Sequence, residues 1–401
     1  MCLRQKLHGI RSERDPKDKM PLVDSYNRTI DYLRISVTDR CNFRCIYCMP
    51  EEGAPVAPKA DILSFEEIER LVRIAISLGM TKIRLTGGEP LVRKDIDRLV
   101  QKIGALPGLR DLSMTTNGFL LARHAAEFAA NGLNRINISL DTLRPDRFAR
   151  LARRGNLDDV LRGIDAATNA GLTPIKLNCV AMRGWNDDEV VDFARLTLEQ
   201  PFDVRFIELM PINWSRGDDS AGEMEKFFAL SAARNNKGGS QIQLYANSEL
   251  ATFRDAFHST DPQVQTGQLD AAQMRRAFIS TDEIRQRIEG SLGPLHPAEI
   301  VTNGPARSFR LDGACGTVGF ISQITNDMCQ NCNRLRLTAD GMLRPCLMAD
   351  GEVDLRTPLR DGSGDEAIEE LFRLTVFHKP REHRLEDGVA PIGRNMSQLG
   401  G

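Results

Sequence analysis

Three cysteines stand close together near the beginning of the chain. Cys41, Cys45 and Cys48 share the eight residues Cys-Asn-Phe-Arg-Cys-Ile-Tyr-Cys, with the spacing C-x3-C-x2-C. Thiolates are soft ligands that select zinc, cuprous copper or iron–sulfur clusters. Three thiolates on one short loop supply one ligand fewer than a closed tetrahedral site takes. Either a remote residue supplies the fourth ligand, or one metal position stays open for chemistry.

This first cysteine set favours an iron–sulfur cluster over zinc. Zinc sites usually combine two close pairs of ligands, whereas this set has no second pair nearby and no histidine within ten residues. A [4Fe–4S] cluster with one open iron fits three thiolates better. Such an iron could bind a small molecule through an amine and a carboxylate and pass it one electron. A structural zinc site with a distant fourth ligand is the alternative.

A second set of three cysteines, Cys329, Cys332 and Cys346, lies in the last quarter of the chain. Its C-x2-C pair is typical of zinc, so zinc is a stronger alternative here. Two arginines, Arg334 and Arg336, stand between the cysteines. A guanidinium group matches phosphate oxygens, so the pair suits a polyanionic substrate. Judged alone, the two arginines would fit a solvated surface strand equally well.

Cysteine usage also indicates the compartment. Six of the nine cysteines fall in these two sets, and clustered cysteines in a long chain without a signal peptide are typical of metal ligands under reducing conditions. Residues 1–26 form a polar N-terminal lead that lacks the apolar segment of a secretory signal. We therefore expect a cytoplasmic protein with a flexible N-terminus.

Composition limits the partners. Hydrophobic residues make up 41% of the 401 residues, and 53 basic against 55 acidic residues give a formal charge of −2. This balance argues against a broad nucleic-acid surface but permits a local basic pocket. No apolar run approaches the ~18 residues that a transmembrane helix needs. We expect neither nucleic acid nor a membrane among the partners.

The middle of the chain alternates between strand and helix patterns. Ser64 and Glu67 form a capping box before a helix with apolar residues at i, i+3 and i+4 spacing. One further helix is predicted to begin at about residue 95, a second to end at residue 130, and a third to span 158–170. A last helix is predicted at 365–375. Six strands are predicted over residues 33–37, 82–86, 111–115, 135–140, 174–180 and 203–209. This order predicts parallel βα units in a barrel, a partial barrel or a doubly wound sheet.

Polar residues cluster where the predicted strands end. The first cysteine set follows the first strand, and Thr86-Gly-Gly-Glu-Pro90 follows the second. Active sites of parallel α/β folds lie at these ends, so the pattern predicts one site. Taken alone, the Gly-Gly-Glu-Pro segment would be no more than a turn that joins a strand to a helix.

The cysteine loop and the Gly-Gly-Glu-Pro turn together resemble the radical S-adenosylmethionine (SAM) superfamily over residues 33–210. The resemblance implies a partial (β/α)6 barrel, similar to a TIM barrel, and a [4Fe–4S] cluster whose unique iron binds the methionine end of SAM. Reduction would cleave SAM to methionine and a 5′-deoxyadenosyl radical that abstracts hydrogen. The glycines of the turn would then offer a backbone edge to the SAM amino group, because glycine permits close approach.

The second cysteine set, its Asn-Arg-Leu-Arg segment and the Gly-Gly terminus narrow the resemblance to the GTP 3′,8-cyclase family, which catalyses the first step of molybdenum cofactor (molybdopterin) biosynthesis. The resemblance implies a lyase with two [4Fe–4S] clusters and GTP between them, the guanine lying near the second cluster. The radical would take the ribose 3′ hydrogen, and C3′ would attack C8 to give (8S)-3′,8-cyclo-7,8-dihydroguanosine 5′-triphosphate. It also implies a homodimer, an electron donor such as flavodoxin or ferredoxin, and a downstream cyclic pyranopterin monophosphate synthase.

The same resemblance assigns roles to individual residues. The first cluster would be bound by Cys41, Cys45 and Cys48, and the second by Cys329, Cys332 and Cys346. SAM contacts would come from Tyr47, Gly88, Ser139 and Met210. GTP contacts would come from Arg34, Arg84, Thr115, Lys176, Arg334, Leu335 and Arg336, with Lys82 a weaker candidate for the triphosphate. Gly400 and Gly401 would reach the active site as a catalytic tail.

These inferences divide the chain into four parts. They are the lead (1–26), the radical SAM partial barrel (27–213), an insertion that we predict to be mobile (214–278), and a C-terminal α+β extension with the auxiliary cluster and substrate contacts (279–401). The insertion is longer and less apolar than the family's connection at this place.

Two other functions compete with the cyclase. Another radical SAM enzyme with an auxiliary cluster, such as a peptide or sulfatase maturase, usually has more C-terminal cysteines and lacks the arginine pair. A zinc-stabilised binding module would be colourless and would not catalyse a reaction.

Overall fold

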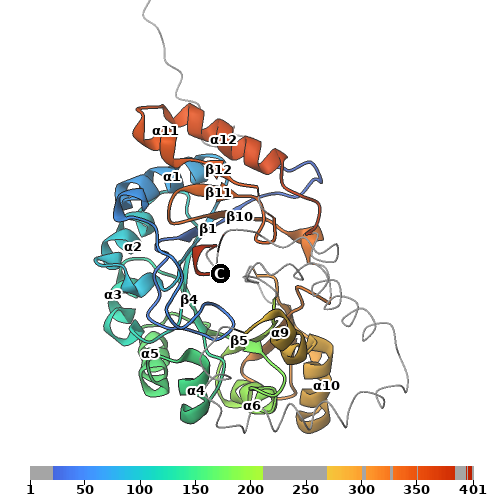
Figure 1. The fold of residues 1–401 in the computed structure, drawn as a ribbon. Helices are drawn as coiled ribbons and strands as arrows, with labels where there is room; N and C mark the ends of the chain where they lie inside the picture. Colours follow the sequence, from blue (N-terminus) through green and yellow to red (C-terminus); the bar gives the residue numbers. More distant parts are fainter. Residues whose placement is uncertain are drawn as a thin grey trace, which may run out of the picture.

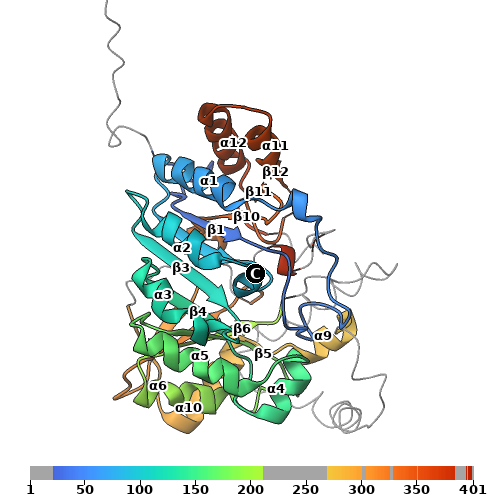
Figure 2. The ribbon, with the colours of Figure 1, turned by 90° about the vertical axis from the view of Figure 1, so that its left-hand side faces the viewer.

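The computed structural model describes residues 21–210, 269–299, 304–325, 328–349, 351–383, 394 and 396–399. One curved sheet forms its centre (Figures 1 and 2). The six predicted strands are present, each with bounds within two residues of those expected. They are β1 (Tyr32–Ser36), β2 (Lys82–Thr86), β3 (Asp111–Thr116), β4 (Arg135–Ser139), β5 (Lys176–Ala181) and β6 (Asp203–Glu208).

Helices cover the outer face of this sheet as an arc (Figure 1). In the described residues they are α1 (Phe65–Ser77), α2 (Ile96–Gly104), α3 (Ala125–Ala130), α4 (Pro145–Ala152), α5 (Leu157–Asn169), α6 (Val190–Glu199), α9 (Ala271–Ala277), α10 (Thr281–Leu292), α11 (Arg356–Arg360) and α12 (Asp365–Phe377). The predicted capping box is present at the start of α1, where Ser64 and Glu67 exchange both bonds. Helix α4 was not predicted, although Pro145 at its first turn is a typical helix-start signal.

The C-terminal region lengthens the same sheet at both edges. Its strands are β7 (His296–Pro297), β8 (Arg307–Arg310), β9 (Thr317–Ile321), β10 (Arg334–Leu337), β11 (Met342–Arg344) and β12 (Val353–Asp354). β9 pairs parallel with β6, and β10 pairs parallel with β1. The segment between β9 and β10, which carries Cys329 and Cys332, therefore connects the two edges of the six-stranded unit. The architecture is a partial barrel, as predicted.

The parallel strands alternate polar and apolar residues. On β1, Leu33 and Ile35 belong to the main hydrophobic core shared with the helices, whereas Tyr32, Arg34 and Ser36 occupy the intervening positions. Successive strand residues point to opposite faces, so the polar set faces the inside of the curve. The other parallel strands continue this alternation, which gives the barrel a polar lumen.

Part of the predicted mobile insertion is ordered helix. α9 begins with a capping box between Asp270 and Gln273, and Met274 and Ala277 are fully buried. This short amphipathic helix was not predicted, because low apolar content in the surrounding stretch concealed it, and the mobility of the insertion stays a prediction. Residues 214–268, the rest of the predicted insertion, lie outside the described residues, as does most of the N-terminal lead.

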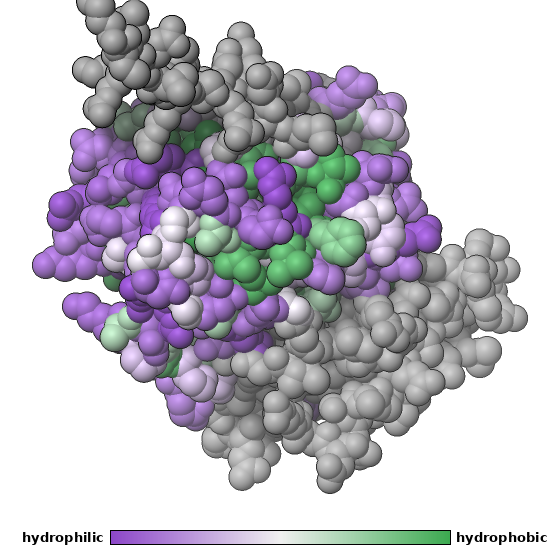
Figure 3. All heavy atoms as spheres, turned by 90° about the horizontal axis from the view of Figure 1, so that it is seen from above, coloured by the Kyte–Doolittle hydropathy of each residue, from purple (hydrophilic) through white to green (hydrophobic). Residues whose placement is uncertain are grey.

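An exposed apolar area lies on the outward face formed by α11 and α12 (Figure 3). Phe377 of α12 is 65% exposed, and Leu374 is 42% exposed. Ser25 donates a hydrogen bond to the Phe377 carbonyl at 2.9 Å, so the exposed Val23 and Tyr26 lie near the same helix end. Within the described residues, no helix is both long and apolar enough to cross a membrane.

Candidate functional site

The loop of the first cysteine set is held by its apolar residues. Phe43 and Ile46 are buried, and the Phe43 ring makes edge contacts with Phe119 and Phe148 at centroid distances of 5.8 and 5.6 Å. Backbone bonds from Arg44 and Ile46 to carbonyls at the end of α4 tie the loop to that helix, at 3.0 and 3.1 Å. The three half-buried thiols are thereby presented from one fixed loop.

The thiol environments fit metal-bound thiolates. The Phe43 N–H donates to Cys41 Sγ at 3.4 Å, and the Ser397 N–H bonds to Cys48. Such N–H donors stabilise and tune cluster sulfurs. Burial, with the negative Glu89 nearby, raises the pKa of Cys41 to about 12. Burial, with Cys41 nearby, also raises the pKa of Cys48 to about 12. A bound cation would therefore be needed to keep these sulfurs ionised.

Asp141 fixes the only tyrosine of the loop. Tyr47 Oη donates to Asp141 Oδ2 at 2.8 Å, and the Val180 N–H donates to Oδ1 at 2.9 Å. Burial raises the pKa of Asp141 to about 6 and that of the Tyr47 phenol well above its usual range. Asp141 was not among the predicted site residues, although Ser-Leu-Asp at the end of the fourth predicted strand was a usable signal.

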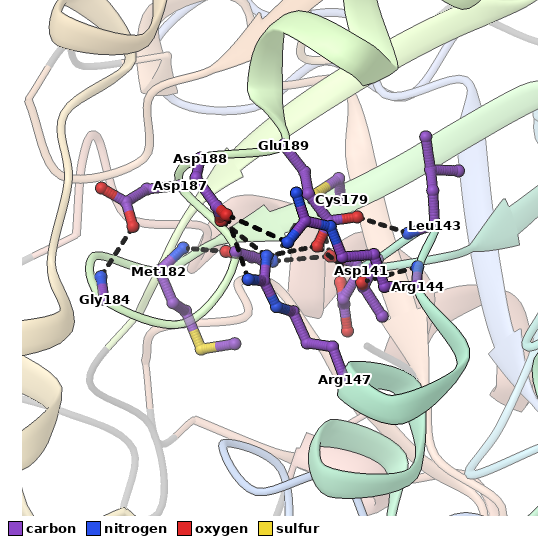
Figure 4. Close-up of polar contacts among 12 residues, drawn as sticks. Asp141, Leu143, Arg144, Arg147, Cys179, Met182, Gly184, Asp187, Asp188 and Glu189 are labelled. Carbon is purple, nitrogen blue, oxygen red and sulfur yellow. Dashed lines mark hydrogen bonds and ion pairs between the residues drawn. The ribbon is translucent and has the colours of Figure 1, made fainter. Parts of the chain in front are cut away.

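A network of carboxylates holds the turn that carries Asp141 (Figure 4). Glu189 accepts hydrogen bonds from Thr142 Oγ1 and the Leu143 N–H, each at 2.6 Å. Arg147 of α4 pairs with the same Glu189 and, at 2.5 Å, with Asp188. The loop before α6 therefore positions both the Asp141 turn and α4, on which the first cysteine loop depends.

The Gly-Gly-Glu-Pro turn packs directly on the first cysteine loop. Gly88 N–H donates to the Thr38 carbonyl at 2.7 Å, and Glu89 N–H donates to the Arg40 carbonyl at 2.8 Å. A Cβ on Gly88 would lie 2.4 Å from the Arg40 carbonyl oxygen. Glycine is therefore required here not only for access of a ligand but also because two backbones approach each other closely.

Glu89 is a second residue that the sequence analysis did not single out. It is buried and accepts hydrogen bonds from Thr116 Oγ1 at 2.6 Å and from the Asn117 N–H at 2.7 Å. Burial raises its pKa to about 7 despite these donors. Glu89 therefore links the ends of β2 and β3 beside the first cysteine set.

The second cysteine set is held by two buried cations from outside its own segment. Arg28 donates to the Cys329 carbonyl at 2.7 Å and to the Pro380 carbonyl at 2.6 Å. Lys379 Nζ donates to the carbonyls of Arg334 and Pro345 at 2.9 and 2.5 Å. Neither cation lies near the cysteines in sequence, so the spacing of the cysteines gave no signal for them.

Lys379 and the neighbouring Arg334 favour thiolate at this set. Burial alone would raise the pKa of Cys332, but the charges of Arg334 and Lys379 and hydrogen bonds from Arg334 lower it to about 6. Met348 N–H donates to Cys346 Sγ at 3.4 Å. Among the described residues, no three cysteine, histidine or carboxylate side chains surround one metal ion. The cysteine ligands of a cubane bind different irons, so these thiols need not converge as they would around a single ion.

Inward-facing cations fill the lumen between the two cysteine sets. Arg34 on β1 stands in register with Arg84 on β2 and with Arg336 on β10. Burial, and then the charge of neighbouring arginines, lowers the pKa of Arg34 well below its usual range and that of Arg336 to about 10. Both Cys332 and Cys346 act on Arg336, so this row reaches the second cysteine set.

Other lumen side chains keep buried polar atoms without a hydrogen-bond partner. They include Thr115 Oγ1, Asn137 Oδ1 and Asn178 Oδ1, on the neighbouring strands β3, β4 and β5. Thr115 stands in register with Asn137, which stands in register with the fully buried Lys176. Buried polar groups in native proteins are nearly always satisfied, so these atoms mark a place for a polar ligand or water.

The remaining predicted site residues fall into three groups. Ser139 faces the lumen in register with Asn178. Met210, like Cys346, packs against the group of buried apolar residues that contains Leu399. Lys82 lies at the start of β2 and is paired with Asp31 at 2.5 Å. The Leu335 side chain lies in the apolar core on the opposite face of β10, so the predicted contact of Leu335 with GTP would come from its backbone.

The chain end reaches the lumen as far as the structure describes it. The short helix η7 (Met396–Gln398) lies in the middle of the barrel in Figure 1. Arg336 donates to the Leu399 carbonyl at 3.3 Å, while Ser397 bonds to Cys48. Gly400 and Gly401, the predicted catalytic tail, lie outside the described residues.

Comparison with known proteins matches both halves of the chain. Residues 35–197 match the family model of the radical SAM superfamily, and residues 263–385 match the model described as Molybdenum Cofactor Synthesis C. The second match begins inside the stretch 214–278 that we predicted to be an insertion.

Relatives that this chain matches over their full length are named GTP 3′,8-cyclase. GTP 3′,8-cyclase of Moorella thermoacetica is 45% identical over 381 residues, covering 95% of this chain and 100% of the relative. GTP 3′,8-cyclase of Heliobacterium modesticaldum is 47% identical over the same shares. A solved structure of Streptococcus suis SuiB bound to S-adenosylmethionine has a TM-score of 0.39 and 19% identity, covering 53% of this chain and 50% of that one.

Replacing Lys379 tests how the second cysteine set is held. Lys379→Met leaves two buried carbonyls without their donor, at a cost of about 1–3 kcal/mol each, and removes a charge that favours the Cys332 thiolate. We expect iron bound after anaerobic reconstitution to fall by roughly half, because the first set should still bind its cluster. Iron analysis with electron paramagnetic resonance measures this. Lys102→Met, at a half-exposed surface pair, is the control, and unchanged iron content in Lys379→Met would contradict this role.

Proposed function

The chain belongs to the GTP 3′,8-cyclase family of radical SAM proteins, and from this premise we propose that its barrel lumen binds GTP between two [4Fe–4S] clusters. The product would be (8S)-3′,8-cyclo-7,8-dihydroguanosine 5′-triphosphate, the first intermediate of molybdenum cofactor biosynthesis. Family membership rests on relatives more than 40% identical over their whole length. The proposal for the site rests on the geometry of the lumen.

The observation that carries this proposal is the row of cations between the two cysteine sets, in which Arg84 and Arg336 are buried and Arg34 is half-buried. Arg336, Arg34 and Arg84 occupy one register level on three adjacent strands, and Lys176 and Thr115 follow on the same face. Burying charges of one sign side by side is costly unless a counter-charge is present. A triphosphate supplies several negative charges and many acceptor oxygens, which suit guanidinium groups.

SAM would occupy the side of the lumen next to the first cysteine set. Tyr47 and Gly88 lie on the two loops that pack together there, Ser139 faces the lumen from β4, and Met210 follows β6. Cys41, Cys45 and Cys48 would hold the first cluster, leaving one iron for the amine and carboxylate of SAM. When bound, the first cluster and SAM would together supply a radical that removes hydrogen from the ribose C3′ of GTP.

The second cluster would be held by Cys329, Cys332 and Cys346 at the opposite side of the lumen. Arg334 and Arg336 join this set to the row of cations, so a nucleotide could contact both. The chain's own residues orient the ribose between the two sides, and burial keeps water from the reacting carbons. A homodimer, a one-electron donor and a downstream cyclic pyranopterin monophosphate synthase complete the proposal.

The direct test is anaerobic turnover followed by mass analysis. The protein is reconstituted with iron and sulfide and incubated with dithionite, SAM and GTP. We expect 5′-deoxyadenosine together with an isomer of GTP, since the hydrogen removed from C3′ is replaced by one at N7. Cys45→Ala should reduce both products to background, whereas Cys315→Ala, an exposed cysteine outside both sets, should retain them.

Two outcomes of this test would contradict the proposal. With clusters loaded, failure to form 5′-deoxyadenosine would exclude the radical mechanism. Formation of 5′-deoxyadenosine without any product from GTP would exclude GTP as the substrate and favour a maturase-like activity.

Lys176 should give GTP binding a pH dependence of defined sign. Burial, with the charge of Arg205 next, lowers the pKa of Lys176 to about 6, so the amine is mostly neutral at neutral pH. A bound triphosphate favours the ammonium form and raises the pKa toward its ordinary value of about 10.4. Binding should then take up a proton, and the Kd should rise by up to about tenfold per pH unit above pH 6–7.

Lys176→Arg is the matched variant, because a guanidinium keeps its charge across this range. The γ-phosphate loses its last proton near pH 6 and works in the opposite direction, but it does so equally for both proteins. Calorimetry in buffers of different ionisation enthalpy measures the proton uptake of each. Equal uptake by the original protein and by Lys176→Arg would contradict a neutral Lys176 in the empty lumen.

A further inference from the structure

A fully buried carboxylate, Glu208, stands at the end of β6, shortly before Met210. Both of its oxygens accept hydrogen bonds. Oε2 accepts from the N–H groups of Ile324 and Thr325, at 2.9 and 3.0 Å. Oε1 accepts from the N–H and the hydroxyl of Thr281, at 3.1 and 3.3 Å, and from the Thr325 hydroxyl. All of these donors are neutral groups, so the carboxylate serves here as a junction of hydrogen bonds.

Glu208 joins segments that lie far apart in the sequence. Thr281 begins α10, which packs beside α6 on the outside of the barrel (Figure 1). Ile324 and Thr325 follow β9, the parallel neighbour of β6, and precede Cys329 of the second cysteine set. The carboxylate therefore fixes the point at which the chain leaves the sheet on its way to the second cysteine set.

The pattern of hydrogen bonds requires a carboxylate at this position. A buried carboxylate is costly unless its oxygens are satisfied, and the bonds to Glu208 satisfy both of them. Each oxygen accepts at least one backbone N–H. An amide nitrogen could replace neither oxygen, because that nitrogen donates and cannot accept. Hydrogen bonds also require narrow ranges of distance and angle, so Glu208 holds the segment after β9 in one defined place.

The segment that Glu208 holds contacts both sides of the lumen. Ile324 belongs to a small group of buried apolar residues that also contains Leu399 of the chain end. Met210, a predicted SAM contact, and Cys346, a predicted ligand of the second cluster, pack against the same group. Protein interiors are densely packed and transmit small displacements. A shift of Ile324 would therefore change the position of the second cysteine set relative to Met210.

We propose that Glu208 is a positioning residue for the radical reaction, because it sets the distance between the SAM side of the lumen and the second cysteine set. This inference rests on the proposed function, in which the radical forms on one side and GTP is held from the other. The central sheet fixes β6 itself, so loss of the carboxylate bonds should displace the segment after β9 and leave the first cysteine set in place. Cleavage of SAM would then continue, but the ribose C3′ would lie at the wrong distance from the radical.

Glu208→Gln tests this role in the reconstituted full chain. The amide nitrogen leaves at least one backbone N–H without its acceptor. We expect SAM to bind with an unchanged Kd, measured by calorimetry. The ratio of cyclised nucleotide to 5′-deoxyadenosine should fall about tenfold, because a displacement of about 1 Å misplaces a reacting carbon. A readout without turnover is the electron paramagnetic resonance spectrum of the reduced second cluster, whose change on addition of GTP alone should be smaller in the variant.

Two further variants separate positioning from loss of stability. Thr325→Val removes one hydroxyl donor but keeps the backbone N–H, so the fold is preserved, and it should lower the same ratio by about threefold. Ile288→Ala removes a fully buried side chain from α10 without touching Glu208. It should lower the Tm at least as much as Glu208→Gln does and leave the ratio unchanged.

The outcomes distinguish a failure of this inference from a failure of the proposed function. The original ratio in both Glu208→Gln and Thr325→Val would overturn the positioning role of Glu208, as would an equal fall of the ratio in Ile288→Ala. If the original protein formed 5′-deoxyadenosine but no product from GTP, the proposed function itself would be overturned.

Discussion

Burial of like charges inside one curved sheet is the constraint on which the rest of the structure depends. Arg34, Arg84 and Arg336 share one level of the lumen, and Lys176 lies close behind them. Each buried ion costs several kcal/mol in desolvation, and the lumen acid Asp203 is shared between Arg205, at 2.5 Å, and Lys176, at 3.9 Å, so it offsets only part of this charge. The lumen is therefore prepared for an anion. The buried like charges lower the stability of the protein without a ligand and favour the binding of an anion.

The two cysteine sets are positioned by residues that are far from them in sequence. Gly88, Asp141 and the end of α4 fix the first loop, whereas Arg28 and Lys379 fix the second. The chain end joins the two sets: Ser397 bonds to Cys48, while Leu399 accepts from Arg336 beside Cys346. A segment of four described residues therefore contacts both the first cysteine set and the arginine row beside the second set.

Local sequence patterns predicted much of this arrangement. The six strands, the capping box of α1 and the six cysteines could be read directly, because each depends on spacing along the chain. The resemblance to a family supplied the lumen residues, and the register places Arg34, Arg84, Thr115 and Lys176 together on one face. The contact of Leu335 with GTP stays a prediction, and strand alternation leaves only its backbone to make that contact. Asp141, Arg28 and Lys379 were missed because their roles depend on long-range packing, and α9 was hidden in a polar stretch.

The central claim is that GTP lies in the lumen with its ribose C3′ facing the bound SAM. GTP labelled with deuterium at C3′ tests this most directly, in a single turnover with dithionite and SAM. The account predicts that one deuterium appears in 5′-deoxyadenosine, as measured by mass spectrometry, and that it is missing from the cyclised nucleotide. Unlabelled 5′-deoxyadenosine, formed together with a product that keeps the deuterium, would contradict the placement of the ribose between the two cysteine sets.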